Sequence, residues 1–204
     1  MKKIGNLYFH GSRKEDNIAL TFDDAPSLET EKILDLLKKY NAKATFFICG
    51  HRIKGHEKTI ERINKEGHEI GNHSYNHERL AFKSQQHIEG DLVKCDEGLA
   101  KLKITTNLFR PPHLSMFYNL FRVCRKLGKK IILCDVISHD WRRKGIDYAV
   151  NNVRNTKPGS ILNFHDYIED FGSNKDLASI LEVILPKLKD KYRFVTVSQL
   201  LFKE

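Results

Sequence analysis

The sequence contains no long apolar run. A helix that spans a membrane needs about 20 consecutive apolar residues, whereas the longest apolar stretch among the 204 residues runs only from about Ala44 to Cys49. Lys2 and Lys3 could open a secretory signal, but the polar residues that follow leave no hydrophobic segment behind them. The sequence therefore predicts no membrane span, and it favours a cytoplasmic location unless a leader has been removed.

Paired cysteines are missing as well. The four cysteines, Cys49, Cys95, Cys124 and Cys134, are widely spaced and form no CxxC motif, so we expect buried free thiols. Linkers, repeats and low-complexity tracts are absent, and a content of 40% hydrophobic and 30% charged residues is typical of a globular protein. A chain of this length suits a single domain, which we place over residues 1–204.

Positive charge is in excess, with a formal net charge of +9. Such an excess can mark a protein that binds nucleic acid, another anionic polymer or a membrane surface. The lysines, however, are spread along many expected helices, and no nucleic-acid-binding motif is present. A solvated basic surface is therefore favoured, and nucleic acid is not an expected partner.

Two histidines four residues apart, His73 and His77, follow a short apolar segment. On a helical turn, residues i and i+4 project from the same face, so both imidazoles could reach one metal ion at about 2.0–2.1 Å. A catalytic metal site typically adds a third ligand, often a carboxylate, and an open position for water. An isolated pair with this spacing is more often two surface polar residues. The question is therefore where a carboxylate could come from.

Short apolar runs alternate with helical patterns along the whole chain. Strands are expected at residues 18–22, 44–48, 68–71, 107–110, 130–136, 160–164 and 194–197. Helices are expected at residues 29–40, 59–66, 84–103, 118–127, 147–155 and about 177–188. This alternation predicts an α/β fold with a parallel sheet covered by helices, either an open sheet or a closed barrel.

The positions of unusual residues favour the barrel. Barrel enzymes assemble their sites from loops at the C-terminal ends of several strands. In this sequence the residues at or just beyond expected strand ends include Asp23, Asp24, His73, His77, Arg110, His113, Asp140, Trp141, His165 and Asp166. We therefore predict a single-domain, distorted (β/α) barrel of about seven parallel strands.

Five motifs resemble those of the NodB-like polysaccharide deacetylases, carbohydrate esterase family 4. They are TFDD at 21–24, HSYNH at 73–77, RPPH at 110–113, DVISHDW at 135–141 and ILNFHD at 161–166. Each motif alone is a weak signal, but all five occur in the family's order and together cover the chain from about Ile18 to Leu200. The resemblance implies a metal-dependent hydrolase that removes acetyl groups, most often N-acetyl groups, from a sugar polymer.

The resemblance also implies a role for each matching residue. Asp24, His73 and His77 would bind one divalent metal ion, with zinc expected first and cobalt, nickel or manganese as alternatives. Asp23 would be the general base, and Arg110 would hold it in place. These residue types suit the chemistry, because amide hydrolysis needs an activated water, a stabilised oxyanion and an acid for the leaving nitrogen.

The remaining implied roles concern the acid and the substrate pocket. His165 would protonate the leaving amine, and Asp140 would orient His165 and stabilise its charged form. Trp141 would line the acetyl pocket. Taken one at a time, such residues could equally be packing or ion-pair residues, and only their joint occurrence favours the catalytic interpretation. The other histidines, namely His10, His51, His56, His68, His87 and His139, are given a structural interpretation.

Three positions depart from the family pattern. Ala25 replaces a glycine, and His113 replaces a tyrosine whose backbone N–H is expected to face the oxyanion. Asn163 replaces a hydrophobic residue, and strand alternation places it on the same face as His165. An unpaired amide there would cost about 1–3 kcal/mol. Two hypotheses follow: either Asn163 has an internal partner, or it binds a polar feature of the substrate.

Two other functions fit the same motifs. Within enzymes, the alternative is a hydrolase of a small amide or of an N-acetylated sugar metabolite. From a different class, the alternative is a barrel that binds glycan without turning it over. The presence of a base, an acid and all three metal ligands argues against the second, because a decayed enzyme is expected to lose at least one of them.

Overall fold

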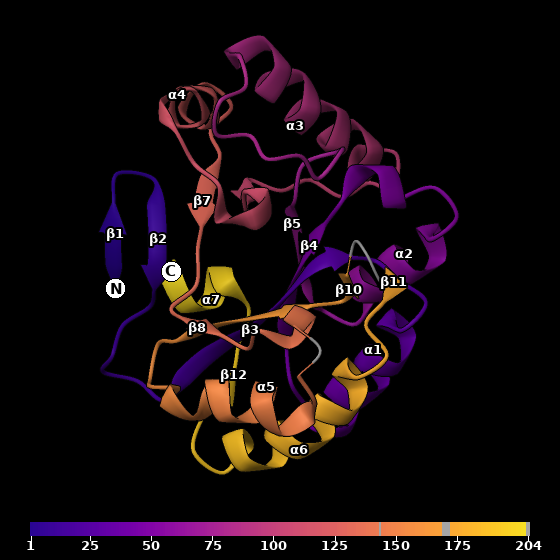
Figure 1. Ribbon diagram of the computed structural model, residues 1–204, viewed down its shortest axis with the longest axis vertical. Helices are drawn as coiled ribbons and strands as arrows, with labels where there is room; N and C mark the ends of the chain where they lie inside the picture. Colours follow the sequence, from indigo (N-terminus) through magenta and orange to yellow (C-terminus); the bar gives the residue numbers. More distant parts are fainter. Residues whose placement is uncertain (143, 169–171, 203–204) are drawn as a thin grey trace.

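A curved, mostly parallel sheet runs through the centre of the molecule (Figure 1). The computed structural model describes residues 1–142, 144–168 and 172–202. The main sheet contains β1 (Lys2–Ile4), β2 (Leu7–His10), β3 (Asn17–Ala25), β4 (Ala44–Ile48), β5 (Glu69–Asn72), β6 (Leu108–Phe109), β7 (Lys130–Ile132), β8 (Val136–Ile137), β9 (Ile161–His165) and β12 (Arg193–Phe194). A separate hairpin is formed by β10 (Tyr167–Ile168) and β11 (Gly172–Ser173).

The strands pair in the order β1-β2-β7-β6-β5-β4-β3-β9-β8, and β12 pairs with the first residues of β3. All of these pairs are parallel except β1 with β2. Within the described ranges this path does not return to its start, so the sheet curls into an open, distorted barrel. The predicted fold class is confirmed, and each of the seven expected strands overlaps an observed one.

Helices cover the outside of the curled sheet (Figure 1). They are α1 (Thr30–Lys39), α2 (Glu57–Lys65), α3 (Gln85–Ala100), α4 (Tyr118–Lys126), α5 (Ile146–Asn152) and α6 (Leu177–Lys189). Short 3₁₀ turns lie at η1 (Gly50–Arg52), η2 (Pro112–Leu114), η3 (Asp140–Arg142) and η4 (Val153–Asn155), and α7 (Val197–Leu201) comes last. None of the helices in the described part of the chain has the length and apolar character needed to cross a bilayer.

Alternate residues of β3 enter different parts of the core. Ile18 and Leu20 belong to the large apolar cluster that also contains residues of α1 and α6. Ala19 instead belongs to a smaller cluster with Phe47, Ile161 and other strand residues and with residues of α7, inside the barrel. Because side chains alternate along a strand, the residues two and four positions after Ala19 also face inward. Polar side chains thereby enter the barrel at the C-terminal end of β3.

The structure differs from the expected elements at several places. The single strand expected at residues 130–136 is divided into two short strands, β7 and β8, and the Leu133 backbone carbonyl between them accepts a hydrogen bond from Arg110. Residues 194–197 hold only the end of β12, after which Thr196 and Gln199 form a capping box that starts α7. The hairpin of β1 and β2 was not expected. Residues 73–77 form a loop rather than a helical turn.

The four cysteines are free, as expected. Cys49, Cys95 and Cys124 are buried, and Cys134 is partly exposed.

Candidate active site

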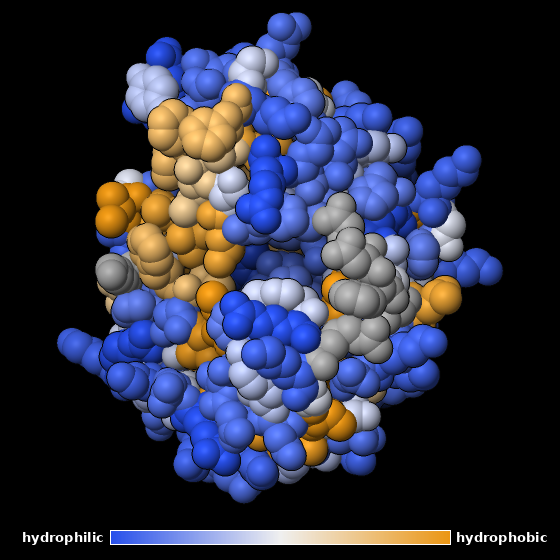
Figure 2. All heavy atoms as spheres, in the orientation of Figure 1, coloured by the Kyte–Doolittle hydropathy of each residue, from blue (hydrophilic) through white to orange (hydrophobic). Residues whose placement is uncertain are grey.

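A cavity of about 910 Å³ opens at the C-terminal ends of the strands. Figure 2 shows the surface hollowed near the middle of the face that Figure 1 presents. Its lining includes all but two of the ten predicted site residues: Asp23, Asp24, His73, His77, His113, Trp141, Asn163 and His165. The other two, Arg110 and Asp140, lie buried behind this lining, where each contacts one of the lining residues. The fold therefore gathers residues that are distant in the sequence, such as Asp23 and Asn163, which are 140 positions apart.

A bulge at the end of β3 directs two successive aspartates into the cavity. In a regular strand, Asp23 and Asp24 would point to opposite faces of the sheet. The pairing of β3 with β4 shifts between Phe22 and Ala25, and Asp24 has a φ of 60°. Such a bulge turns a side chain away from the regular alternation. Both carboxylates consequently line the same cavity.

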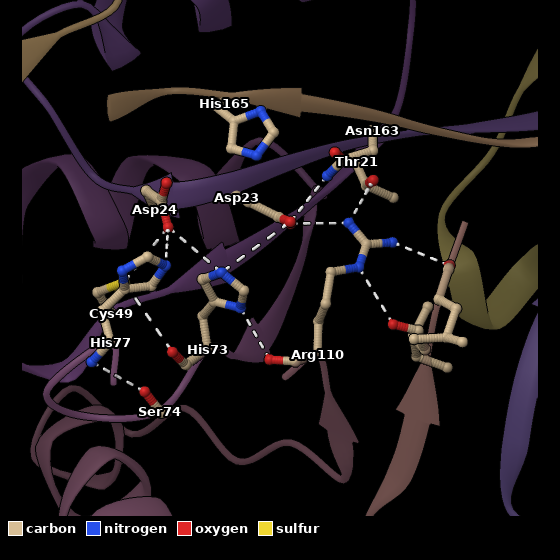
Figure 3. Close-up of polar contacts among 12 residues, drawn as sticks. Thr21, Asp23, Asp24, Cys49, His73, Ser74, His77, Arg110, Asn163 and His165 are labelled. Atoms are coloured by element: carbon tan, nitrogen blue, oxygen red, sulfur yellow. Dashed lines mark hydrogen bonds and ion pairs between the residues drawn. The ribbon is translucent and has the colours of Figure 1, made fainter. Parts of the chain in front are cut away.

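Asp24, His73 and His77 form a group that could hold a metal ion, since their ligand atoms all lie within 4.8 Å of one another. Oδ1 of Asp24 is 2.8 Å from Nε2 of His77 and 3.3 Å from Nε2 of His73. Figure 3 shows both imidazoles turned toward this carboxylate. Ligands of a four-coordinate zinc ion lie roughly 3.3 Å from one another, given metal–ligand distances of about 2.0–2.1 Å. The spacing therefore suits a small divalent ion.

A tight loop, rather than a helical turn, brings the two histidines together. Ser74 and His77 have φ values of 67° and 59°. Ser74 Oγ accepts a hydrogen bond from the backbone N–H of His77, and the Asp91 carboxylate accepts from the backbone N–H groups of residues 75 and 76. The i,i+4 spacing thus predicted the correct pair for the wrong geometric reason.

The electrostatics of the group also suit a cation. Nδ1 of His73 lies 2.8 Å from the backbone carbonyl of Arg110, which can only accept, so Nδ1 carries a hydrogen and Nε2 is the nitrogen that a metal ion could bind. Burial alone would raise the pKa of Asp24, but His73 and His77 hold that pKa well below its ordinary value. An ionised carboxylate and an oriented imidazole are the donors that a divalent ion requires.

Asp23 is held by two donors at the inner wall of the cavity. Nη1 of Arg110 donates to Oδ1 of Asp23 at 2.7 Å, and Nδ2 of Asn163 donates to Oδ2 at 2.7 Å. Oδ2 is also 4.0 Å from Nε2 of His73, so it is the carboxylate oxygen that faces the metal-binding group. The contact expected between Arg110 and Asp23 is present. Of the two hypotheses for Asn163, the structure supplies the partner that the internal one requires.

His165 faces Asp23 and Asp24 across the cavity and is backed by Asp140. Oδ1 of Asp140 lies 3.0 Å from Nδ1 of His165, and Oδ2 accepts the backbone N–H of His165 at 2.9 Å. Burial alone would lower the pKa of His165, but Asp140, with smaller contributions from Asp24 and Asp23, raises it to about 9. The ring of Trp141 packs edge-on against the imidazole at 4.6 Å between centroids. The imidazolium is therefore the form held at neutral pH.

His139 lies at the cavity, although the sequence suggested only a structural role for it. It lines the cavity with a φ of 56°, and its ring lies 4.9 Å from that of Trp141. Its Nδ1 atom is buried without a hydrogen-bond partner among the residues that the structure describes. Its position inside the fourth motif, next to Asp140, was the available signal.

Other lining residues were missed because they lie on loops, in a 3₁₀ turn or in two-residue strands, which carry no periodic pattern. They are Asn76, Glu78, Arg79, Lys83, Leu114, Ile137, Tyr167 and Ile168.

Comparison with known proteins gives a consistent result. A family model described as polysaccharide deacetylase matches residues 10–132. A peptidoglycan-N-acetylglucosamine deacetylase from Bacillus cereus is 35% identical over 206 residues, which cover 98% of this chain and 95% of the relative.

Two solved structures extend the comparison. A peptidoglycan N-acetylglucosamine deacetylase, in complex with a benzamide compound, superposes with a TM-score of 0.91 at 33% identity, covering 98% of this chain and 94% of the other. A family 4 acetyl xylan esterase from Clostridium thermocellum, in complex with a cobalt ion, superposes with a TM-score of 0.81 at 31% identity, covering 90% and 89%.

Proposed function

The chain belongs to the polysaccharide deacetylase family and is a carbohydrate deacetylase, and from this premise we propose that it removes N-acetyl groups from the N-acetylglucosamine units of peptidoglycan. The observation that carries the proposal is the match, over almost the whole of both chains, to a relative named for that activity. The residues that would bind a metal ion, the base and the acid all line one cavity, and this combination supports turnover rather than binding alone.

A divalent ion held by Asp24, His73 and His77 would supply Lewis-acid polarisation of the acetyl carbonyl and a lowered pKa for water. We propose zinc as this ion, because Asp and His ligands in a nearly tetrahedral arrangement suit it. Cobalt, nickel and manganese remain alternatives, because such a ligand set accepts several divalent ions.

The side chains of the cavity then carry the protons. As water attacks the acetyl carbon, Oδ2 of Asp23 accepts the proton that water releases, and a carbon–oxygen bond forms. Nδ1 of His165 is held by Asp140, so the proton on Nε2 is the one available to the leaving nitrogen. When the carbon–nitrogen bond breaks, His165 gives this proton to the nitrogen, and acetate and a free amine are the products.

Two exposed rings near the cavity support a polymeric substrate. Phe82 and Phe117 are 88% and 53% exposed, with 5.2 Å between their ring centroids. Lys83, the residue after Phe82, lines the cavity, and its backbone carbonyl accepts a hydrogen bond from the Asn119 side chain on α4, which ties the two ring-bearing segments together. Exposed apolar patches often mark ligand-binding surfaces. A glycan longer than one sugar could lie across these rings while one acetyl group enters the cavity.

Acetate release, combined with elemental analysis of the purified protein, tests the proposal. We expect one equivalent of a divalent metal and faster release from peptidoglycan fragments than from chito-oligosaccharides or small acetylated amides. Release from small amides alone would favour the metabolite hydrolase, whereas glycan binding with no release from any substrate would favour a binding barrel. The His73→Ala variant provides the background rate.

A further inference from the structure

Both carboxylate oxygens of Asp23 accept hydrogen bonds, and the two donors lie within or just after two different strands. Arg110, just after β6, reaches Oδ1, and Asn163, within β9, reaches Oδ2, each at 2.7 Å. Arg110 is fully buried, and Asn163 is 3% exposed. Figure 3 shows the carboxylate between these two side chains. Both contacts are therefore shielded from bulk water.

Arg110 alone cannot fix the orientation of this carboxylate. A guanidinium often binds a carboxylate with two parallel hydrogen bonds, but here only Nη1 reaches Asp23. Nε donates to the Ile132 carbonyl and Nη2 to the Leu133 carbonyl, each at 3.1 Å. Nη1 itself is shared with Thr21 Oγ1 at 2.7 Å. A single contact at one oxygen leaves the carboxylate free to turn about its Cβ–Cγ bond, a torsion with broad preferences.

Strand register explains why position 163 can supply the second contact. In the parallel pairing of β3 with β9, Thr21 is opposite Asn163, and Asp23 is opposite His165. Side chains two residues apart share a face, so the side chain at position 163 points diagonally toward Asp23 on the inner side of the barrel. An apolar side chain there would leave Oδ2 without a donor. An acidic one would place two carboxylates side by side.

We propose that Asn163 is a positioning residue, which fixes the plane of the Asp23 carboxylate so that Oδ2 stays turned toward the metal-binding group. This inference rests on the proposed function for the role of Asp23 as the base. Oδ2 is 4.0 Å from Nε2 of His73, and rotation of the carboxylate would carry this oxygen away from the metal-binding group, beside which the attacking water would lie. Removal of Asn163 therefore misplaces the base without removing it.

The contact itself is tested without any reaction. Chemical unfolding of the metal-free wild type, Asp23→Ala, Asn163→Leu and the double variant forms a double-mutant cycle. We expect the two substitutions to be non-additive, because each removes the same hydrogen bond. Additive changes would overturn the contact. Asn163→Ser, which shortens the side chain beyond reach, repeats the cycle if the leucine variant does not fold.

The positioning role is tested by kinetics. Asn163→Leu should lower kcat by ~10–100-fold, the range for loss of a hydrogen bond to a charged group, with KM and metal content nearly unchanged. Asn163→Gln, which keeps the amide, should recover part of the rate, and in the Asp23→Asn background Asn163→Leu should have no further effect.

The matched control is Thr45→Val at a residue outside the cavity lining, which loses a partly buried hydrogen bond to Glu69 and a buried one from the backbone N–H of residue 197. It should reduce stability and leave kcat unchanged. An unchanged kcat with an altered KM in Asn163→Leu would overturn positioning and favour direct substrate contact. A wild type that binds metal but releases no acetate from any substrate would contradict the proposed function. In that case the unfolding cycle would still decide whether the hydrogen bond between Asn163 and Asp23 exists.

Discussion

Replacement of Asp140 by Asn should shift the alkaline limit of activity to lower pH. Asp140 contacts His165 through both carboxylate oxygens and is itself buried, so its charge acts on the imidazole with little screening. Burial opposes the charged imidazole, yet the pKa of His165 is raised from 6.5 to about 9. This difference corresponds to roughly 3 kcal/mol in favour of the imidazolium. Asparagine keeps the shape of the side chain and removes its charge.

The sign of the effect follows from the role of His165 as an acid. The imidazolium is populated below its pKa, so the wild type should keep its activity up to about pH 9. If the pKa in the variant returns toward 6.5, the protonated fraction at pH 8 falls roughly 30-fold, whereas at pH 5.5 the two proteins differ little. The interaction that raises this pKa also stabilises the folded state. Its contribution to the free energy of unfolding is fully present below about pH 6.5 and is lost as the pH rises through 9. This part of the pH dependence of stability should also disappear in the variant.

The assay is kcat/KM for acetate release across pH 5–10, with each variant compared with the wild type at the same pH. Ser138→Ala is the matched control, because it removes the hydrogen bond that an uncharged hydroxyl donates to Asp140 and leaves the charge of the Asp140 carboxylate in place. Its alkaline limb should stay close to that of the wild type. If kcat/KM of Asp140→Asn still declined only near pH 9, the assignment of this alkaline decline to His165 would be refuted.

Three further results are expected. His73→Ala should remove bound metal and activity together, as measured by elemental analysis and acetate release, and full metal occupancy with unchanged activity would contradict the ligand assignment. Asp23→Asn should keep the metal and lower the rate by ~10²–10⁴-fold, whereas Asp24→Asn should weaken metal binding; the opposite pattern would exchange the two roles. Phe82→Ala combined with Phe117→Ala should raise KM for long glycan fragments and leave disaccharides unaffected, and an equal effect on both lengths would argue against stacking on these rings.

Most of the fold could be predicted because its long elements carry strong periodic patterns. The strand at Ala44–Ile48 was predicted with the observed bounds, since a short apolar run rich in aromatic and β-branched residues has few alternatives. The segments that were misassigned are short, and their structure depends on distant partners. Between β7 and β8 the Leu133 carbonyl accepts a hydrogen bond from Arg110, a residue 23 positions earlier, and nothing near Leu133 in the sequence indicates this.

The site was predicted through its motifs rather than through geometry. The resemblance placed Arg110 beside Asp23 and Asp140 beside His165, and both contacts are present. The catalytic roles of these residues remain predictions. Sequence reasoning could place Asn163 on the inner face but could not choose its partner, because that choice depends on which oxygen of Asp23 the arginine leaves open.

The two neighbouring aspartates show most clearly what the sequence leaves undetermined. Strand alternation alone would send Asp23 and Asp24 to opposite faces, and then one of them could not reach the cavity. The bulge at Asp24 brings both inward and gives each a different environment. Asp23 accepts hydrogen bonds from Arg110 and Asn163, which orient its carboxylate. Asp24 contacts the two histidines, with which it would share a metal ion. A distortion of the backbone at one residue therefore separates a base from a ligand, although the two carboxylates are chemically identical and adjacent in the chain.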